Sequence, residues 1–249
     1  MGQAEKRIAL VIGAGGGIGR ALSKGLAQHG IAVAAASLSR AAAEETVAAI
    51  VREGGEAFGI GVDIVKKSEV QEMVEKVLSK YGQIDILINS AGTVTRASVA
   101  DMPESDWDRI IAVNLKGVFL CCQAVARHMM ERRQGCILTL TSGRREAGFP
   151  NGSHYSASKA GVNALTRTLA LELASYNIRV NAIGPGATDT AAYRANVPAN
   201  VVAERLRRHP LQGGAGRPED IVRTALYFVT ESSSYVTGQV FYLKDPHSS

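Results

Sequence analysis

The stretch from Arg7 to Gly19 reads Arg-Ile-Ala-Leu-Val-Ile-Gly-Ala-Gly-Gly-Gly-Ile-Gly, and it decides the fold. Its first half is a short apolar run typical of a buried β-strand, and helical periodicity begins after the last glycine. Glycines here allow a tight turn and let the backbone approach a pyrophosphate, whose charge the N-terminus of the following helix stabilises. We therefore predict a strand–turn–helix unit that binds a dinucleotide, with a purely structural tight turn as the alternative.

Short apolar runs alternate with longer segments of helical periodicity along the whole chain. The runs are hydrophobic almost without interruption, which is typical of parallel strands buried on both faces. We expect strands at 7–12, 31–36, 57–62, 84–88, 136–140, 179–183 and 239–243, and helices at 20–28, 41–52, 68–80, 107–132, 156–174 and 219–230. This alternation predicts right-handed βαβ units and an α/β fold, a doubly wound parallel sheet of about seven strands with helices on both faces.

Composition and charge narrow the possible functions. The chain has 249 residues, of which 46% are hydrophobic and 20% charged, enough for the core of a single domain over 1–249. The net charge of +5 fits an anionic ligand but is too small and too dispersed for a nucleic-acid partner. No stretch approaches the roughly 18 apolar residues of a membrane span, and none forms a signal peptide.

The cysteines give no indication of a metal site. Cys121, Cys122 and Cys136 lack metal-ligand spacing and cannot all pair with one another. We therefore expect reduced thiols, no metal and a cytoplasmic protein.

One long stretch, 184–216, interrupts the alternation of strands and helices. It contains Pro185, Pro198, Pro210 and a cluster of arginines, and it follows the carboxyl end of an expected strand. Ligands of open α/β sheets bind beyond such ends, and long excursions inside domains are often binding loops. We predict that 184–216 is a substrate-binding loop or lid.

A second informative run is Ser153-His-Tyr-Ser-Ala-Ser-Lys159, in which a tyrosine and a lysine stand four residues apart. In a helix these positions share one face, so the ammonium of Lys159 would lie beside the phenol of Tyr155. A nearby cation favours phenolate and lowers the phenol pKa from about 10 toward neutrality. Tyr155 is therefore a candidate general acid or base, and Ser142, thirteen residues upstream, strengthens the hypothesis.

These motifs together resemble the short-chain dehydrogenase/reductase family, and the resemblance covers essentially the whole chain and implies a Rossmann-type fold. The matching pieces stand in family order: Gly13/Gly17/Gly19, Asp63, Asn89-Ser-Ala-Gly92, Asn114-Leu-Lys-Gly117, Ser142, Tyr155-x-x-x-Lys159, and Pro185-Gly186 followed by Thr188. Three features depart from the family pattern: Ile12 replaces a Thr, Ser90 replaces an Asn, and the segment 242–249 lacks the usual Gly-Gly pair.

The resemblance implies catalytic roles for four residues. Tyr155 would be the general acid in ketone reduction and the base in alcohol oxidation, and Ser142 would hold the substrate oxygen. Lys159 would lower the tyrosine pKa and bind the nicotinamide ribose, and Asn114 would hold a water that relays protons. Taken singly, Ser142 could cap a turn and Asn114 could be a buried structural amide, but the four together favour catalysis.

The resemblance also implies a set of dinucleotide contacts. Asp63 would bind the adenine amino group, and Asn89 and Gly92 would lie near the ribose and diphosphate, with a sheet-stabilising amide as the alternative for Asn89. The complete expected set is Gly13, Gly16, Gly17, Ile18, Gly19, Ser37, Ser39, Arg40, Asp63, Ile64, Asn89, Ala91, Gly92, Tyr155, Lys159, Pro185, Gly186 and Thr188.

The choice between NADP and NAD depends on the segment after the second expected strand. That segment, 36–40, reads Ala-Ser-Leu-Ser-Arg and has no acid until Glu44, whereas NAD enzymes carry an acid there for the ribose hydroxyls. Two hydroxyls and a guanidinium suit a 2′-phosphate. Against this, Gly16 stands where many NADP-dependent relatives carry Arg or Lys, and Arg40 could be the solvated start of a helix. We expect NADP(H), with NAD(H) possible.

Within the family, the chain looks closest to 3-oxoacyl-carrier-protein reductases. The expected reaction is NADP(H)-dependent reduction of a ketone, such as a 3-oxoacyl thioester, to a secondary alcohol. A carrier protein or CoA attached to this small-molecule substrate would meet arginines, for which a solvated helix surface is the alternative. The candidates are Arg132, Arg133, Arg144, Arg145, Arg194, Arg205, Arg207 and Arg208.

The family also implies a homotetramer, assembled through 107–132, 156–174 and the C-terminal strand. Two other functions stay open. One is an NAD-dependent secondary-alcohol or polyol dehydrogenase that uses the same residues. The other is a catalytically silent dinucleotide-binding regulator, against which the intact catalytic set argues.

Overall fold

Seven parallel strands form the centre of the structure, a computed structural model that describes residues 6–143, 148, 150–196, 199–208 and 216–243. The sheet order is β3-β2-β1-β4-β5-β6-β7, and each neighbouring pair is parallel. The strands are β1 (Ile8–Ile12), β2 (Ala32–Ser37), β3 (Ala57–Gly61), β4 (Ile86–Asn89), β5 (Gly135–Leu140), β6 (Ile178–Pro185) and β7 (Val240–Leu243). The predicted α/β fold with a doubly wound parallel sheet is confirmed.

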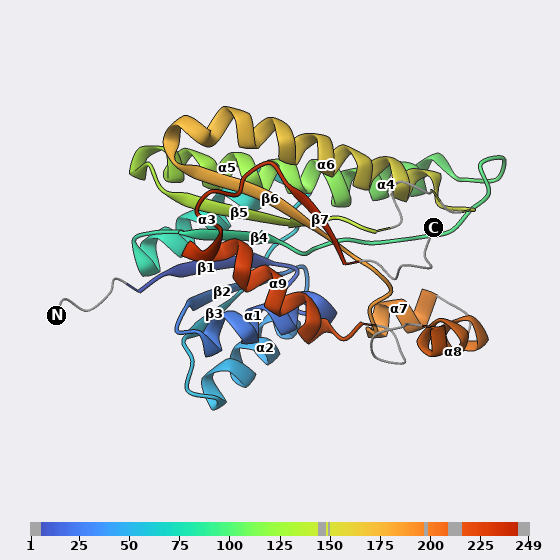
Figure 1. Ribbon diagram of the computed structural model, residues 1–249, viewed down its shortest axis with the longest axis horizontal. Coiled ribbons are helices and arrows are strands. Elements are labelled where there is room, and N and C mark those ends of the chain that lie inside the picture. The colour runs from blue at the N-terminus through green and yellow to red at the C-terminus, as the bar shows by residue number, and fades with distance from the viewer. Residues whose placement is uncertain (1–5, 144–147, 149, 197–198, 209–215, 244–249) are drawn as a thin grey trace.

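Helices cover both faces of this sheet, and the strand sequences explain why. On β1, Leu10 and Ile12 enter one hydrophobic cluster while Ala9 and Val11 enter the other, since successive side chains of a strand point to opposite faces. One face carries α3 (Lys67–Tyr81), α5 (Gly117–Arg132) and α6 (Ser153–Leu173) (Figure 1). The other carries α1 (Gly17–Gln28), α2 (Arg40–Arg52) and α9 (Pro218–Val229).

The helix expected at 107–132 is longer than predicted and is not uniform. It begins with α4 (Glu104–Ile111), passes through the π-helical turn η1 (Ala112–Lys116) and continues as α5. A π turn adds a residue to one helical turn and often marks a functional site, and this one contains Asn114.

The helical segment made of α4, η1 and α5 is also rich in apolar residues. This segment, Glu104–Arg132, contains an 18-residue window whose mean hydropathy is 1.5. By length and composition alone, the helix could cross a membrane. This is a weaker criterion than the expected run of roughly 18 apolar residues, because the segment also contains polar and charged residues such as Asn114 and Lys116. Cys121, Val125 and Met129 of α5 are buried in the core, which accounts for much of the apolar composition.

The stretch 184–216 is not a plain loop. Its first two residues still belong to β6, and it contains α7 (Ala191–Asn196) and α8 (Ala199–Arg208). Figure 1 shows these two short helices set apart from the helical layers, on the side of the sheet where β6 ends. Two short 3₁₀ turns, η2 (Ala174–Tyr176) and η3 (Glu231–Ser233), complete the described elements.

The order of the strands locates a crevice. From β1 the chain builds outward through β2 to β3, and from β4 it builds the other way to β7, so the order reverses between β1 and β4. Their last residues, Ile12 and Asn89, are paired in register. Ligands of doubly wound sheets bind beyond the strand ends at such a reversal.

Candidate active site

A cleft of about 850 Å³ lies along the carboxyl ends of the strands. It contains most of the residues that the sequence singled out. Those that line it are Gly13, Gly16, Gly17, Ile18, Gly19, Ser37, Asp63, Ile64, Ala91, Gly92, Ser142, Tyr155, Lys159, Pro185, Gly186 and Thr188. Four others, Ser39, Arg40, Asn89 and Asn114, are not among the lining residues.

The glycine-rich turn at the floor of the cleft has no room for side chains at several positions, among them Gly13 and Gly19. A Cβ on Gly13, whose φ is +82°, would lie 2.6 Å from the backbone nitrogen of Ala91. A Cβ on Gly19 would lie 2.1 Å from the carbonyl oxygen of Gly13. At Gly16, by contrast, the space is open, and no side chain caps the first turn of α1. Uncapped N–H groups beside an open cleft fit the pyrophosphate of a dinucleotide.

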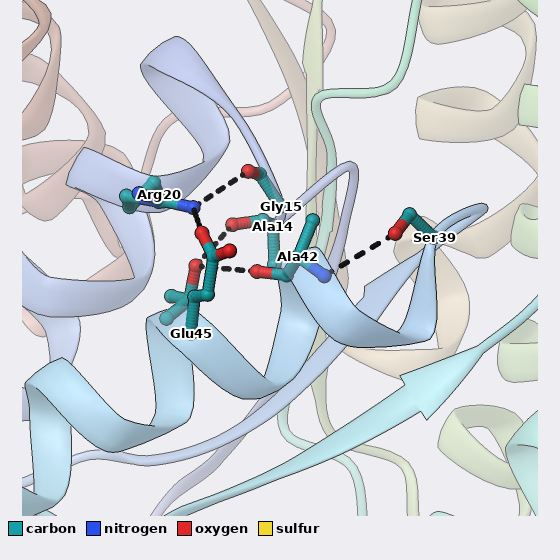
Figure 2. Close-up of polar contacts among 7 residues, drawn as sticks. Ala14, Gly15, Arg20, Ser39, Ala42 and Glu45 are labelled. Carbon is teal, nitrogen blue, oxygen red and sulfur yellow. Dashed lines mark hydrogen bonds and ion pairs between the residues drawn. The ribbon is translucent and has the colours of Figure 1, made fainter.

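Side chains of α1 and α2 hold this turn in place (Figure 2). The Nη2 of Arg20 donates to the carbonyl of Gly15 at 3.0 Å and lies 2.8 Å from the carboxylate of Glu45. The hydroxyl of Thr46 donates to the carbonyl of Ala14 at 2.8 Å. The turn is therefore bound to the neighbouring helix before any ligand arrives.

The segment 36–40, which was expected to select the cofactor, lies partly in the lining of the cleft and partly outside it. Ser37 and the exposed Leu38 line the cleft. Ser39 accepts a hydrogen bond from the N–H of Ala42 at 3.3 Å and so caps α2 (Figure 2). Arg40 starts α2 and forms a loose ion pair with Glu44 at 3.6 Å. The phosphate-binding role of Ser39 and Arg40 therefore stays a prediction.

Lys159 is the most informative group in the cleft. The first turn of α6 carries Tyr155 and the second carries Lys159, whose Nζ lies 5.8 Å from the centre of the tyrosine ring. The lysine is buried and its Nζ donates to the carbonyl of Leu140 at 2.9 Å. Burial lowers the pKa of Lys159 from 10.5 to about 8. Tyr155 and Lys159 lie close together, as their spacing predicted, and the lowering of the phenol pKa by this ammonium stays a prediction.

Ser142 follows β5 at the edge of the cleft. The residues on either side of it are bonded to β6, because Thr141 N–H donates to the carbonyl of Ile183 at 2.8 Å and Gly143 N–H donates to that of Pro185 at 3.0 Å. The backbone on both sides of the serine is thus held by the sheet, and Ser142 lines the same cleft as Tyr155.

Asn114 lies behind this wall, fully buried. Its amide donates to the carbonyl of Thr93 at 2.9 Å and to Ser158 Oγ at 3.3 Å, and its carbonyl oxygen accepts from Thr93 N–H at 2.8 Å. Ser158 in turn donates to the carbonyl of Tyr155 at 2.7 Å. The structural amide weighed for Asn114 is present, and the water relay stays a prediction.

Asn89 also faces the interior. It is buried at the end of β4, and its amide donates to Thr139 Oγ1 at 3.3 Å and contacts Cys122 Sγ at 3.4 Å. These bonds match the sheet-stabilising alternative, so cofactor contact by Asn89 stays a prediction.

Several residues of the cleft were missed by the motifs. Thr93 and Val94 follow directly after the Asn-Ser-Ala-Gly run, and Arg109 and Val113 stand four apart on one side of α4 and η1. For Arg109 and Val113, the i, i+4 spacing is the sequence signal that could have shown that they share one side of a helix. Tyr193 of α7 also lines the cleft, so part of 184–216 does reach the site.

The remaining candidate residues lie elsewhere. Arg132 pairs with the buried Asp85 at 2.8 Å, Arg133 donates to the carbonyl of Ser175, and Arg194 pairs with Asp189. Arg144, Arg145 and the segment 244–249 lie outside the described residues, as do the side chains of Arg205, Arg207 and Arg208.

The thiols are not suited to redox or nucleophilic work. Cys121, Cys122 and Cys136 are buried and free, and burial raises the pKa of all three, that of Cys122 to about 12. Within the described ranges, no group of three or more His, Cys, Asp or Glu residues is placed to hold a metal ion.

Comparison with known sequences gives matches over nearly the whole chain. A family model described as Enoyl-(Acyl carrier protein) reductase matches residues 13–244. The 3-oxoacyl-[acyl-carrier-protein] reductase FabG of Thermotoga maritima is 40% identical over 240 residues, 95% of each chain. The (2S)-[(R)-hydroxy(phenyl)methyl]succinyl-CoA dehydrogenase subunit BbsD of Thauera aromatica is 37% identical, over 96% of this chain and 95% of its own.

Solved structures also match nearly the whole chain. A short-chain type dehydrogenase/reductase from Mycobacterium marinum is 34% identical with a TM-score of 0.90, covering 96% of this chain and 94% of its own. A 7α-hydroxysteroid dehydrogenase complexed with NADH and 7-oxo glycochenodeoxycholic acid is 32% identical with a TM-score of 0.92, covering 99% and 98%.

Proposed function

The chain belongs to the short-chain dehydrogenase/reductase family and is an NAD(P)-dependent oxidoreductase, and on this premise we propose that it reduces the 3-keto group of an acyl thioester with NADPH. The observation that carries the proposal is the buried Lys159 beside Tyr155 in a cleft floored by the glycine-rich turn. The similarity to the 3-oxoacyl-[acyl-carrier-protein] reductase of Thermotoga maritima supports the thioester.

The cofactor and the side chains have separate roles in the proposed reaction. A nicotinamide dinucleotide supplies the hydride when it is bound. Ser142 donates a hydrogen bond to the ketone oxygen and so polarises the carbonyl. Tyr155 gives its phenolic proton to the developing alkoxide, and the ammonium of Lys159 stabilises the resulting phenolate. In the reverse direction Tyr155 accepts the proton of the alcohol.

The residues that would hold the dinucleotide follow the floor of the cleft. The turn from Gly13 to Gly19 would bind the diphosphate, Asp63 would accept from the adenine amino group, and Ser37 would meet the 2′-phosphate. Asp63 lines the cleft, and its Oδ1 already accepts from Val65 N–H at 3.2 Å, so its carboxylate is held in one orientation. No acid follows β2 before Glu44, which favours NADPH over NADH.

The acyl group would be linked to a carrier protein or to CoA. One relative acts on a carrier-protein thioester and another on a CoA thioester, as their names state. Arg132 and Arg133 each already bind a partner within the chain, which leaves fewer of the proposed arginines for such a ligand. We further propose a single cytoplasmic domain over 1–249, assembled as a homotetramer, in which 184–216 forms the substrate side of the cleft.

The test is oxidation of NADPH and of NADH by the purified protein, with a short 3-oxoacyl thioester as substrate. We expect turnover with a preference for NADPH. A preference for NADH would overturn the cofactor assignment. The absence of turnover with either cofactor, in a protein that binds both, would overturn the substrate class.

An NAD-dependent alcohol dehydrogenase is the second candidate. Gly16 offers no cation to a 2′-phosphate, and Ser39 and Arg40 lie outside the lining of the cleft. The hydroxysteroid dehydrogenase of similar structure was solved with NADH. Oxidation of secondary alcohols or polyols with NAD⁺, faster than ketone reduction with NADPH, would favour this candidate. A silent regulator is disfavoured by the complete catalytic set.

A further inference from the structure

Residues 93–97, which follow β4, form hydrogen bonds at every second position, first to Asn114 of η1 and then to the residues around the start of α6. Thr93 binds Asn114 through both its N–H and its carbonyl group. Two residues later, Thr95 Oγ1 lies 2.8 Å from Nε2 of His154. A spacing of two is that of an extended chain, whose alternate residues face one side.

The third bond lies just beyond. The N–H of Ala97 donates to the carbonyl of Asn151 at 3.1 Å, two residues before α6 begins. Thr93 and Val94 of the same segment line the cleft. One wall of the cleft is therefore joined by two of these contacts to the residues around the start of α6, and one of the two is made by His154, which immediately precedes Tyr155.

His154 is an unusual group for this position. Its side chain is fully buried, and its Nδ1 has no hydrogen-bond partner among the residues that the structure describes. The contact between Nε2 and Thr95 Oγ1 is therefore the one hydrogen bond that holds the ring among the described residues, and the tautomer decides which of the two groups donates it.

We propose that His154 is a positioning residue for the reaction: its hydrogen bond to Thr95 sets the first turn of α6, and with it the phenol of Tyr155, against the wall of the cleft. The proposal rests on the proposed function, in which Tyr155 is the general acid. The physical reason is that proton transfer depends steeply on geometry, so that a displacement of about 1 Å can lower a rate by about a hundredfold.

Substitutions at Thr95 and at His154 test the hydrogen bond between these two side chains by removing one partner at a time. Thr95→Val keeps the shape and deletes the hydroxyl, His154→Leu deletes the ring nitrogens, and His154→Gln keeps a donor that can reach Thr95. The matched control is Thr166→Val, because Thr166 lies in the same helix, is buried, and donates to the carbonyl of Val162 at 2.8 Å, far from the cleft.

We expect kcat to fall about a hundredfold in Thr95→Val and in His154→Leu, with the dissociation constant of NADPH unchanged. The double variant should be no slower than either single one, because all three lack the same bond. His154→Gln should recover most of the loss, and Thr166→Val should keep the wild-type kcat. The proposal would be overturned if the losses of kcat in the two single variants multiplied in the double variant. It would also be overturned if the variants lost thermal stability and kept the wild-type kcat.

A second measurement does not depend on turnover. Crystal structures of the wild type and of Thr95→Val should differ in the position of the Tyr155 phenol by about 1 Å. An unmoved phenol would overturn the positioning role, whatever the substrate is. A displaced phenol in a protein that does not reduce 3-oxoacyl thioesters would instead support the positioning role and count against the proposed function.

Discussion

The two ends of the cleft are built differently. Around Tyr155, the side chains of Asn114, Ser158 and Lys159 are buried, and each forms a hydrogen bond to the backbone or to another of the three. Around the start of α2, Leu38 is 78% exposed, and the side chain of Arg40 is 76% exposed in a loose ion pair.

This difference separates two tasks. Proton transfer needs groups held within a fraction of an ångström, and buried, fully bonded side chains provide that rigidity. Discrimination between cofactors needs only the correct charge near a phosphate, and exposed groups can supply it because they cost little to hold in water. We therefore expect substitutions at the buried end to have large effects on rate and stability, and those at the exposed end to have small effects that change preference.

The largest effect should come from Tyr155→Phe. It removes the proton donor and leaves the ring in place, so kcat should fall by about 10³-fold or more while NADPH binding is retained. Stopped-flow reduction and fluorescence titration measure the two quantities. Tyr227→Phe, on the exposed surface of α9, is the control and should behave as the wild type. Turnover retained by Tyr155→Phe would contradict the assignment of the acid.

Lys159→Met should remove activity and yet stabilise the cofactor-free protein. Burial lowers the pKa of Lys159 to about 8, so the unfolded chain binds this proton more tightly than the folded one. The penalty to the wild type is nearly complete below about pH 8, decreases as the pH rises from 8 to 10.5, and is lost above 10.5. We expect the variant to gain about 3 kcal/mol at pH 7 and about 2 kcal/mol at pH 9.

Urea unfolding at the two pH values measures this gain. Lys76→Met, at an exposed position on α3, serves as the control and should show no such pH dependence. If Lys159→Met is less stable than the wild type at pH 7, burial does not dominate the energetics of this lysine.

Ser37→Asp tests the exposed end. An acid after β2 accepts from the ribose hydroxyls and repels a 2′-phosphate. The ratio of kcat/KM for NADPH to that for NADH should fall about tenfold, or roughly 1.4 kcal/mol, with kcat for NADH unchanged. The effect should shrink at high salt, because exposed charges are screened. An unchanged ratio would mean that Ser37 is not near the phosphate.

The smallest effect is expected from Ser39→Ala. It deletes the cap of α2 and should lower the free energy of unfolding by about 1 kcal/mol. Ser79→Ala, at an exposed position inside α3, should act in the opposite direction by a few tenths, since alanine is the better helix former. Thermal unfolding compares the two. A parallel loss of NADPH affinity in Ser39→Ala would give Ser39 a second role at the phosphate.

Some features of the fold and the site could be predicted from the sequence and others could not, for physical reasons. The strands were found because the central ones are buried on both faces, and β1 carries no polar residue in Ile8–Ile12. Tyr155 and Lys159 were found because their spacing within one helix places them together. The partners of Asn114, by contrast, are Thr93 and Ser158, 21 and 44 residues away, and no local pattern links such positions.

The sequence by itself determined the α/β architecture, the glycine-rich turn and the placement of Tyr155 and Lys159, the proposed acid–base pair, on one face of a helix, because each depends on local periodicity or on the space at one residue. Only the tertiary structure decided the rest. It placed Asn89 and Asn114 behind the wall of the cleft, made Ser39 a helix cap, and joined His154 to Thr95, 59 residues away in the chain. Burial and long-range hydrogen bonds arise only when distant segments pack together, and these determine which of the candidate residues reach the cleft.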